Sequence, residues 1–115
     1  MWEIVTIEMF DEWFLGLNEE EQTDVLASIE LLQVKGPQLG RPYADTLENT
    51  KDVKNLKELR VQHHGKPYRV FYAFDPKRKG VMLCGGNKTG DKRFYKRMIP
   101  IAETEFLKYL ESEGL

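Results

Sequence analysis

Three β-prone segments that follow one another at short intervals constrain this chain most. They are LKELRV (56–61), YRVFYAF (68–74) and VMLCGG (81–86). The residues between them include HHGKP and DPKRKG, which are typical of turns, and strands joined this closely pair in antiparallel fashion. Side chains alternate between the two faces of a sheet, so Arg69 is expected to lie on the opposite face from Tyr68. The three segments therefore predict an antiparallel meander.

The residues before the meander predict a short strand and two helices. WEIVTI (2–7) is β-prone, and apolar residues at helical spacing mark a helix over 8–17. Asn18 can cap a second helix with its side chain, and the acids that follow suit the positive end of a helix dipole. Gly36 and Pro37 are expected to end this second helix. Its apolar stripe is expected to comprise Val25, Leu26, Ile29, Leu32 and Val34.

The remaining segments complete an α+β fold. Residues 37–53 carry the Pro, Gly, Asn and Asp residues that are typical of a loop. Apolar residues at helical spacing after Pro100 predict a closing helix over 101–110. The order β-α-α-β-β-β-α then predicts a mostly antiparallel sheet with helices packed on one face. With 115 residues, the chain is expected to form a single domain over 1–115.

The composition and the N-terminal sequence indicate the cellular compartment in which the protein is expected to act. No apolar run approaches the roughly 18–20 residues that span a bilayer, so no membrane association is expected. The N-terminus, MWEIVTIEMF, carries acids where a signal peptide needs cations. The only cysteine, Cys84, lies in an apolar strand and is expected to be a small buried hydrophobe. These features predict a cytoplasmic protein.

Charge is distributed very unevenly along the chain. Residues 1–50 hold 2 cations and 11 acids, whereas residues 51–97 hold 14 cations and 4 acids. Residues 98–115 add 1 cation and 4 acids, which brings the whole chain to −2. A block of +10 in a mildly acidic protein suits contact with a polyanion such as a nucleic acid. A solvated strand face is the plainer alternative.

The glycine-rich stretch GGNKTGDKRFY (85–95) does not fit a nucleotide-binding loop. That motif needs G-x-x-x-x-G-K-[ST], and here no glycine stands five residues before Gly86. Its glycines are instead expected to end the last strand and let the backbone pass close to RNA. A metal site is not expected either, because the adjacent His63 and His64 should point apart and no ligand pair has zinc spacing. No cofactor is predicted.

Metal-free acid–base chemistry on a phosphodiester suits the basic block better. Attack of an RNA 2′-hydroxyl on its own phosphate needs a base, an acid and positive charge around the phosphorane. Tyr95 could transfer a proton if neighbouring cations lowered its pKa, and either histidine could act as acid or base. Tyr95 could also simply pack against the last helix, and Arg69 could be an ion-pair partner of Asp75 or Glu58. The cations suited to stabilise charge are Arg69, Lys88, Lys92, Arg93 and Lys96.

The chain resembles a known toxin family over essentially its whole length. The elements that carry the resemblance are LGRPYADTL, K-E-L-R, P-Y-R-V-F-Y-A-F-D and G-x-K-T-G-D-K-R-x-Y, in this order. Together they resemble the phage-derived HigB-like branch of the RelE/ParE superfamily. The resemblance implies a type II toxin that cleaves mRNA at the ribosome without a metal and so inhibits translation. It also implies a cognate HigA-like helix-turn-helix antitoxin, through which the complex would contact operator DNA.

The resemblance also assigns expected roles to residues. Arg69 corresponds to the arginine that contacts the scissile phosphate, and Tyr95 corresponds to the acid–base tyrosine. A ParE-like gyrase inhibitor or a non-catalytic adaptor on the same scaffold remains an alternative. The expected catalytic set comprises Arg69, Tyr95, Lys88, Lys92 and His64, and the expected RNA contacts are Lys57, Arg60, His63, Arg93 and Lys96.

Overall fold

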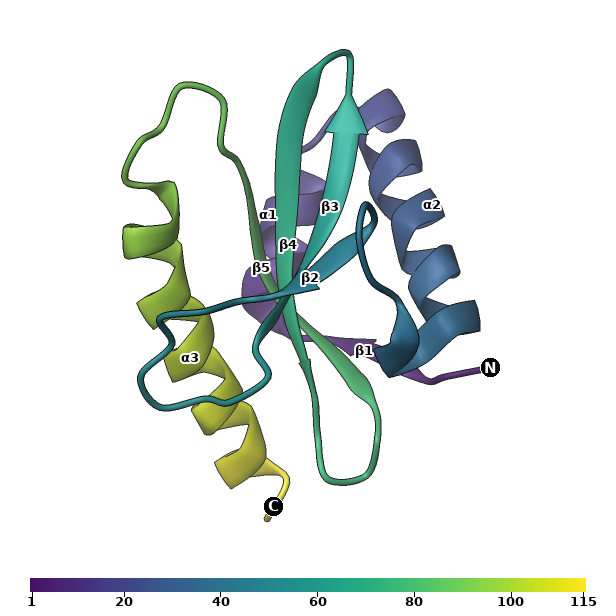
Figure 1. The fold of residues 1–115 in the computed structure, drawn as a ribbon. Helices are drawn as coiled ribbons and strands as arrows, with labels where there is room; N and C mark the ends of the chain where they lie inside the picture. Colours follow the sequence, from purple (N-terminus) through teal and green to yellow (C-terminus); the bar gives the residue numbers. More distant parts are fainter.

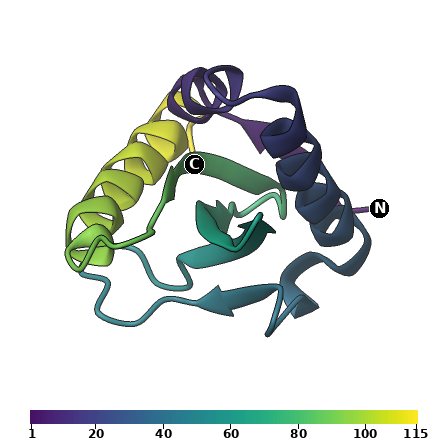
Figure 2. The same cartoon turned by 90° about the horizontal axis from the view of Figure 1, so that it is seen from above.

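A twisted five-stranded sheet lies at the centre of the chain, with helices on both sides (Figures 1 and 2). The computed structural model describes all residues, 1–115. The strands lie side by side in the order β1-β5-β4-β3-β2. The elements are β1 (Ile4–Thr6), α1 (Glu8–Leu15), α2 (Glu19–Lys35), a short 3-10 turn η1 (Gly36–Gln38), β2 (Ala44–Thr46), β3 (Lys57–His63), β4 (Lys66–Phe74), β5 (Gly80–Asn87) and α3 (Phe94–Ser112).

The predicted meander is confirmed, and two short strands extend it. β3, β4 and β5 pair in antiparallel fashion, with β4 in the middle. β1 pairs with β5 in parallel, so the sheet is mixed. β2 pairs with β3 within the segment that was expected to be loop. Its three residues, ADT, have little strand propensity of their own, and the pairing of Ala44 with Leu59 places it at the sheet edge.

The helices cover both faces of the sheet. α1 and α2 pack on the face that carries Tyr68, Val70 and Tyr72, whereas α3 packs on the face that carries Phe71 and Ala73. The α+β class and the predicted element order are confirmed, apart from the additional β2 and η1. The expectation that all helices share one face is corrected: β4 is apolar at nearly every position because it is buried from both sides.

Helix boundaries show where local signals were sufficient. Asn18 forms the predicted N-cap, as part of a reciprocal capping box with Glu21. In the predicted stripe of α2, Leu26 and Val34 are instead 48% and 58% exposed. α3 begins at Phe94 rather than after Pro100, which lies inside it.

No helix has the length and apolarity needed to cross a membrane.

The early start of α3 follows from burial. Phe94, Met98 and Ile99 all lie before Pro100 and are buried against the sheet. A proline inside a helix costs about 3 kcal/mol because it lacks an N–H and its ring crowds the preceding turn. Burial of three large apolar side chains, at roughly 1.5–3 kcal/mol each, outweighs this cost. The helix therefore continues through the proline.

Two adjacent glycines let helices approach β5 closely from opposite faces. A Cβ atom on Gly85 would lie 2.5 Å from the indole ring of Trp13 in α1. A Cβ atom on Gly86 would lie 2.9 Å from the ring of Phe94 in α3. Both glycines lie at the C-terminal end of β5, as the predicted strand over 81–86 had them, and Asn87 adds one further residue. They serve helix packing.

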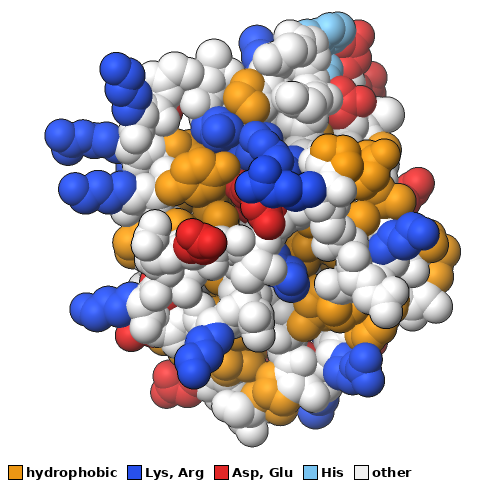
Figure 3. All heavy atoms as spheres, in the orientation of Figure 1, with side chains coloured by type: hydrophobic (Ala, Val, Ile, Leu, Met, Phe, Trp, Pro, Cys, Tyr) orange, Lys and Arg blue, Asp and Glu red, His pale blue; other side chains and the backbone are white.

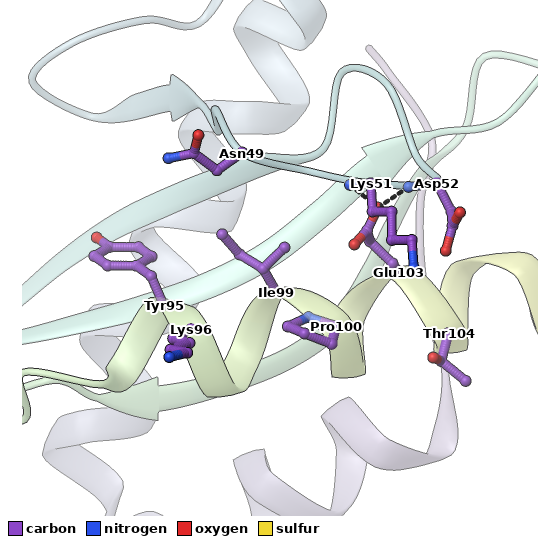
Figure 4. A pocket seen from close by; sticks show the side chains of 9 residues that line it. All are labelled: Asn49, Lys51, Asp52, Tyr95, Lys96, Ile99, Pro100, Glu103 and Thr104. Atoms are coloured by element: carbon purple, nitrogen blue, oxygen red, sulfur yellow. Dashed lines mark hydrogen bonds between the residues drawn. The ribbon is translucent and has the colours of Figure 1, made fainter.

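A buried glutamate ties the long β2–β3 connection to α3. Oε2 of the Glu103 carboxylate accepts hydrogen bonds from the backbone N–H groups of Lys51, Asp52 and Val53, with N–O distances of 2.9, 2.5 and 2.8 Å. Figure 4 shows two of these bonds, from Lys51 and Asp52, above α3. Because the connection has little regular structure, this carboxylate replaces the hydrogen bonds that a strand or helix would supply.

We expect replacement of Glu103 to loosen this connection. Glu103→Ala leaves three N–H groups without their acceptor, which should lower the free energy of unfolding by about 3 kcal/mol. Glu103→Gln keeps one acceptor oxygen and should be intermediate. Urea unfolding followed by circular dichroism measures the change, with the exposed Glu111→Ala in the same helix as control. Equal midpoints for Glu103→Ala and Glu111→Ala would contradict the anchoring role.

Candidate active site

A groove runs along the α3 face of the sheet and passes Tyr95. It consists of two adjoining hollows that share Asn49, Tyr95 and Ile99. We call it the Tyr95 groove. One hollow is lined further by Arg41, Asp45, Thr46, Leu47, Glu48, Glu58 and Arg60. The other, drawn in Figure 4, is lined further by Lys51, Asp52, Lys96, Pro100, Glu103 and Thr104.

Three polar side chains meet beneath the groove and form what we call the central triad: Glu58, Arg69 and Tyr95. The Tyr95 hydroxyl donates to Glu58 Oε1 at 2.6 Å. The Nε of Arg69 lies 3.3 Å from the Tyr95 hydroxyl and 3.4 Å from Glu58 Oε1. The side chains of Arg69 and Glu58 are only 4% and 8% exposed. Of the two ion-pair partners considered for Arg69, the structure places Glu58 beside it.

Strand alternation places the triad. Glu58 and Arg60 are two residues apart on β3 and therefore share a face, and Arg60 pairs directly with Arg69 on β4. Tyr95 is the second residue of α3, which lies over this face. Arg69 also donates from Nη1 to the carbonyl oxygen of Tyr68 at 3.0 Å. The guanidinium is thus held by a carboxylate, a phenol and the backbone at once.

A buried ion pair of this kind is not explained by stability. Removing two charges from water costs several kcal/mol per ion, and apolar residues of similar volume often stabilise a core as well or better. Arg69 and Glu58 are nevertheless buried beside the apolar Phe71 on this face. A costly polar group at the floor of a groove is typical of a functional site.

The surroundings of Tyr95 favour its protonated form. Burial is the largest effect that raises the pKa of Tyr95, and the hydrogen bond to Glu58 raises it further. Arg69 acts in the opposite direction and does not compensate. The expectation that neighbouring cations lower the pKa of Tyr95 is therefore wrong. The raised pKa keeps the Tyr95 phenol protonated near neutral pH.

Several of the predicted cations surround the Tyr95 groove. Arg60 lines it and forms no ion pair, and Lys96 lines the second hollow. The ammonium group of Lys88 lies 5.3 Å from the centre of the Tyr95 ring. Lys92 and Arg93 are exposed, just before α3 begins. Figure 3 shows a group of Lys and Arg side chains near the middle of the face it displays, and further ones towards its edges.

Three of the predicted site residues lie elsewhere. Lys57 alternates with Glu58, so it belongs to the opposite face, where its Nζ donates to the Thr46 hydroxyl at 2.8 Å. His63 and His64 lie at the tip of the β3–β4 hairpin and contact carboxylates of α2. Neither histidine lines the Tyr95 groove. The strand alternation that places Arg69 also excludes Lys57 and His63.

Two residues of the site were not predicted from the sequence. Glu58 was considered only as an ion-pair partner, although it is one of four acids in the basic block and shares a face with Arg60. Arg41 comes from a segment that was expected to be loop; its guanidinium donates twice to Asp45, at 2.9 and 2.7 Å, on the rim of the groove. No local signal in the sequence connects it with β3.

Cys84 and Arg69 are both buried, so neither is accessible to a ligand in the groove. Cys84 is buried as expected, and burial raises the pKa of its thiol to about 12, so it is unreactive. The Arg69 side chain is only 4% exposed and does not line the Tyr95 groove. Of the two strand arginines, Arg60 lines the groove and Arg69 does not.

Comparisons with known proteins place the chain among phage-related sequences. The chain is 39% identical over 111 residues to "Putative toxin HigB3" of Mycobacterium tuberculosis, covering 96% of this chain and 95% of that protein. It is also 39% identical over 106 residues to "Putative toxin HigB2" of the same organism, covering 90% of this chain and 52% of that protein. No solved structure matches the chain significantly. The family model described as "Phage derived protein Gp49-like" matches residues 12–107, and the chain therefore belongs to this Gp49-like family.

Proposed function

We propose that this chain is the toxin of a type II toxin–antitoxin system and that it cleaves mRNA on the ribosome, without a metal, to stop translation. The names of its two relatives support the toxin role. The observation that carries the nuclease assignment is the central triad at the floor of a groove lined by the unpaired Arg60. The resemblance to RelE/ParE toxins agrees with this assignment.

The central triad can supply both proton transfers of RNA cleavage. Glu58 is the carboxylate that accepts the proton of the attacking 2′-hydroxyl, which then bonds to the adjacent phosphorus. Tyr95, held in its protonated form, donates a proton to the leaving 5′-oxygen as the P–O bond breaks. The products are a 2′,3′-cyclic phosphate and a 5′-hydroxyl. The hydrogen bond between Tyr95 and Glu58 then returns the proton from the carboxylic acid to the phenolate.

Positive charge around the groove stabilises the phosphorane. Arg60 and Lys88 flank Tyr95 from the sheet and from the β5–α3 connection, and Lys96 continues the charge along the second hollow. Arg69 acts from below as a positioning residue, since it contacts both Glu58 and Tyr95 but is shielded from the groove. Preorganised charge of this kind is usually the largest contribution to such a reaction.

The partners follow from the same proposal. The neutralising partner is a HigA-like helix-turn-helix antitoxin, through which the complex contacts its operator DNA. The substrate is ribosome-bound mRNA, which the basic segment 51–97 contacts through phosphates. Such a system acts in the cytoplasm.

We expect Tyr95→Phe and Glu58→Gln each to lower the single-turnover rate of mRNA cleavage by about 10²–10⁴-fold, because each removes one proton-transfer group. The rate is measured by primer extension on a ribosome-bound reporter mRNA. Tyr109→Phe is the matched control: this phenol lies in the same helix and donates to Asp75 at 2.9 Å, outside the groove.

Wild-type cleavage by Tyr95→Phe would contradict the acid assignment. Growth arrest with altered DNA supercoiling and no mRNA cuts would instead favour the ParE-like gyrase inhibitor. Growth arrest that survives every change in the triad but weakens with each lost cation would indicate a non-catalytic adaptor.

Arg60→Gln should weaken RNA binding and reduce its dependence on salt. A phosphate contact contributes about one unit to the slope of log K against log salt concentration, so losing it should lower that slope by about 1. Fluorescence anisotropy with a single-stranded RNA over a KCl series measures this, in the Tyr95→Phe background to prevent cleavage. Lys77→Gln, in the exposed β4–β5 turn, is the control. Equal slopes for both variants would exclude Arg60 as a phosphate contact.

A further inference from the structure

We propose that Glu20, His63 and His64 form a binding site for a divalent transition-metal ion such as Zn²⁺, with Asp24 orienting His63. Each of the three residues offers a ligand atom, and these atoms lie within 4.8 Å of one another. The site lies where the tip of the β3–β4 hairpin meets the first turn of α2. It is separate from the function proposed above, because His63 lies on the opposite face of β3 from Glu58.

The hairpin turn brings the two histidines together. Adjacent residues of a strand point to opposite faces, which is why the sequence predicts that His63 and His64 diverge. His64 and Gly65 form the two-residue turn, and both have positive φ, at 49° and 77°. This combination is typical of a type I′ turn, which reverses the chain tightly. His64 therefore folds back, and the two imidazole rings lie 4.2 Å apart between centres.

Asp24 prepares His63 as a ligand. Its carboxylate lies 2.5 Å from Nδ1 of His63. In the neutral tautomer that donates from Nδ1 to this carboxylate, the lone pair of Nε2 is available to a metal. Carboxylates that orient metal-binding histidines in this way are a recurrent feature of zinc sites. His63 is buried, so its ring is held in place, whereas Glu20 and His64 are exposed and can adjust. The site thus has one fixed ligand and two adaptable ones.

The donor set selects the class of ion. Two imidazole nitrogens and one carboxylate oxygen suit Zn²⁺, Ni²⁺ or Cu²⁺, whereas Mg²⁺ and Ca²⁺ prefer oxygen ligands. Zinc–ligand bonds of about 2.0–2.2 Å place tetrahedral ligand atoms roughly 3.3–3.6 Å apart, so the more distant atoms of this set must approach by up to about 1.5 Å. Glu20 and His64 already lie 3.1 Å apart, at Oε2 and Nε2. Three protein ligands leave a fourth tetrahedral position for water or a partner's side chain.

A bound ion would connect two elements that now share only side-chain contacts. His63 and His64 belong to the hairpin, and Glu20 belongs to α2, 43 residues earlier than His63. An ion that binds the folded chain and not the unfolded one stabilises it, by an amount that grows with the logarithm of the ion concentration above the dissociation constant. The melting temperature should therefore rise with added Zn²⁺.

Calorimetric titration of the metal-free full chain with ZnCl₂ tests the proposal. We expect one Zn²⁺ per chain, and we expect Co²⁺ bound in its place to show the visible absorption of a tetrahedral site. His64→Ala and Glu20→Gln should abolish the saturable binding, and both positions are exposed, so the fold is kept. Asp24→Asn should weaken Zn²⁺ binding about 10–100-fold, because it removes the carboxylate that accepts from the other ring nitrogen of the ligating His63.

Glu19→Gln is the matched control, since Glu19 is exposed in the same helical turn but does not belong to the cluster. Unchanged Zn²⁺ affinity in Glu19→Gln together with loss in Glu20→Gln supports the site. Absence of stoichiometric binding, or equal binding by wild type and His64→Ala, would overturn it and leave the cluster as surface ion pairs only. If His64→Ala also cleaves mRNA at the wild-type rate, then the metal site and the proposed nuclease activity are independent, and either proposal can fail without the other.

Discussion

The alternation of side chains along β3 is the constraint on which both polar sites depend. Successive residues of a strand point to opposite faces, and here each face is covered by its own helices. Glu58 and Arg60 consequently face α3, whereas Lys57 and His63 face α2. A shift of one residue in the pairing of β3 with β4 would exchange the two sets and dismantle both. The apolar residues between them, such as Leu59, fix that register by their burial.

The central triad shows how a buried charge is made tolerable. Arg69 is surrounded by acceptors, namely the Glu58 carboxylate, the Tyr95 hydroxyl and the Tyr68 carbonyl. Each member of the triad therefore limits what the others can do: Glu58 keeps Tyr95 protonated, and Arg69 keeps Glu58 in reach of it. Burial and these mutual hydrogen bonds hold the side chains of Arg69 and Glu58 in place. The cations that line the groove are instead more exposed residues, among them Arg60.

The sequence was most informative where one element determines its own structure. The meander, the Asn18 cap and the helix end at Gly36 were predictable, because alternation, capping and glycine conformations are local properties. The distribution of helices over two faces was not, since it depends on which side of the sheet each helix packs. For the site, alternation separated Arg69 from Tyr68, but Glu58 was overlooked because an acid inside a basic block resembles a surface ion pair. The paired histidines were misjudged for a different reason: a left-handed turn cancels the divergence that strand geometry predicts.

Pro100 divides α3 into two halves with different attachments. Tyr95 lies in the half before the proline, and Glu103, which holds residues 51–53, lies in the half after it. The proline removes one main-chain hydrogen bond between the halves, and helices bend where such a bond is missing. One half of the helix thus carries the proposed proton donor, and the other half holds the segment that lines the groove beside it. The two contributions of α3 to the groove therefore belong to segments joined by one fewer main-chain hydrogen bond than an uninterrupted helix would have.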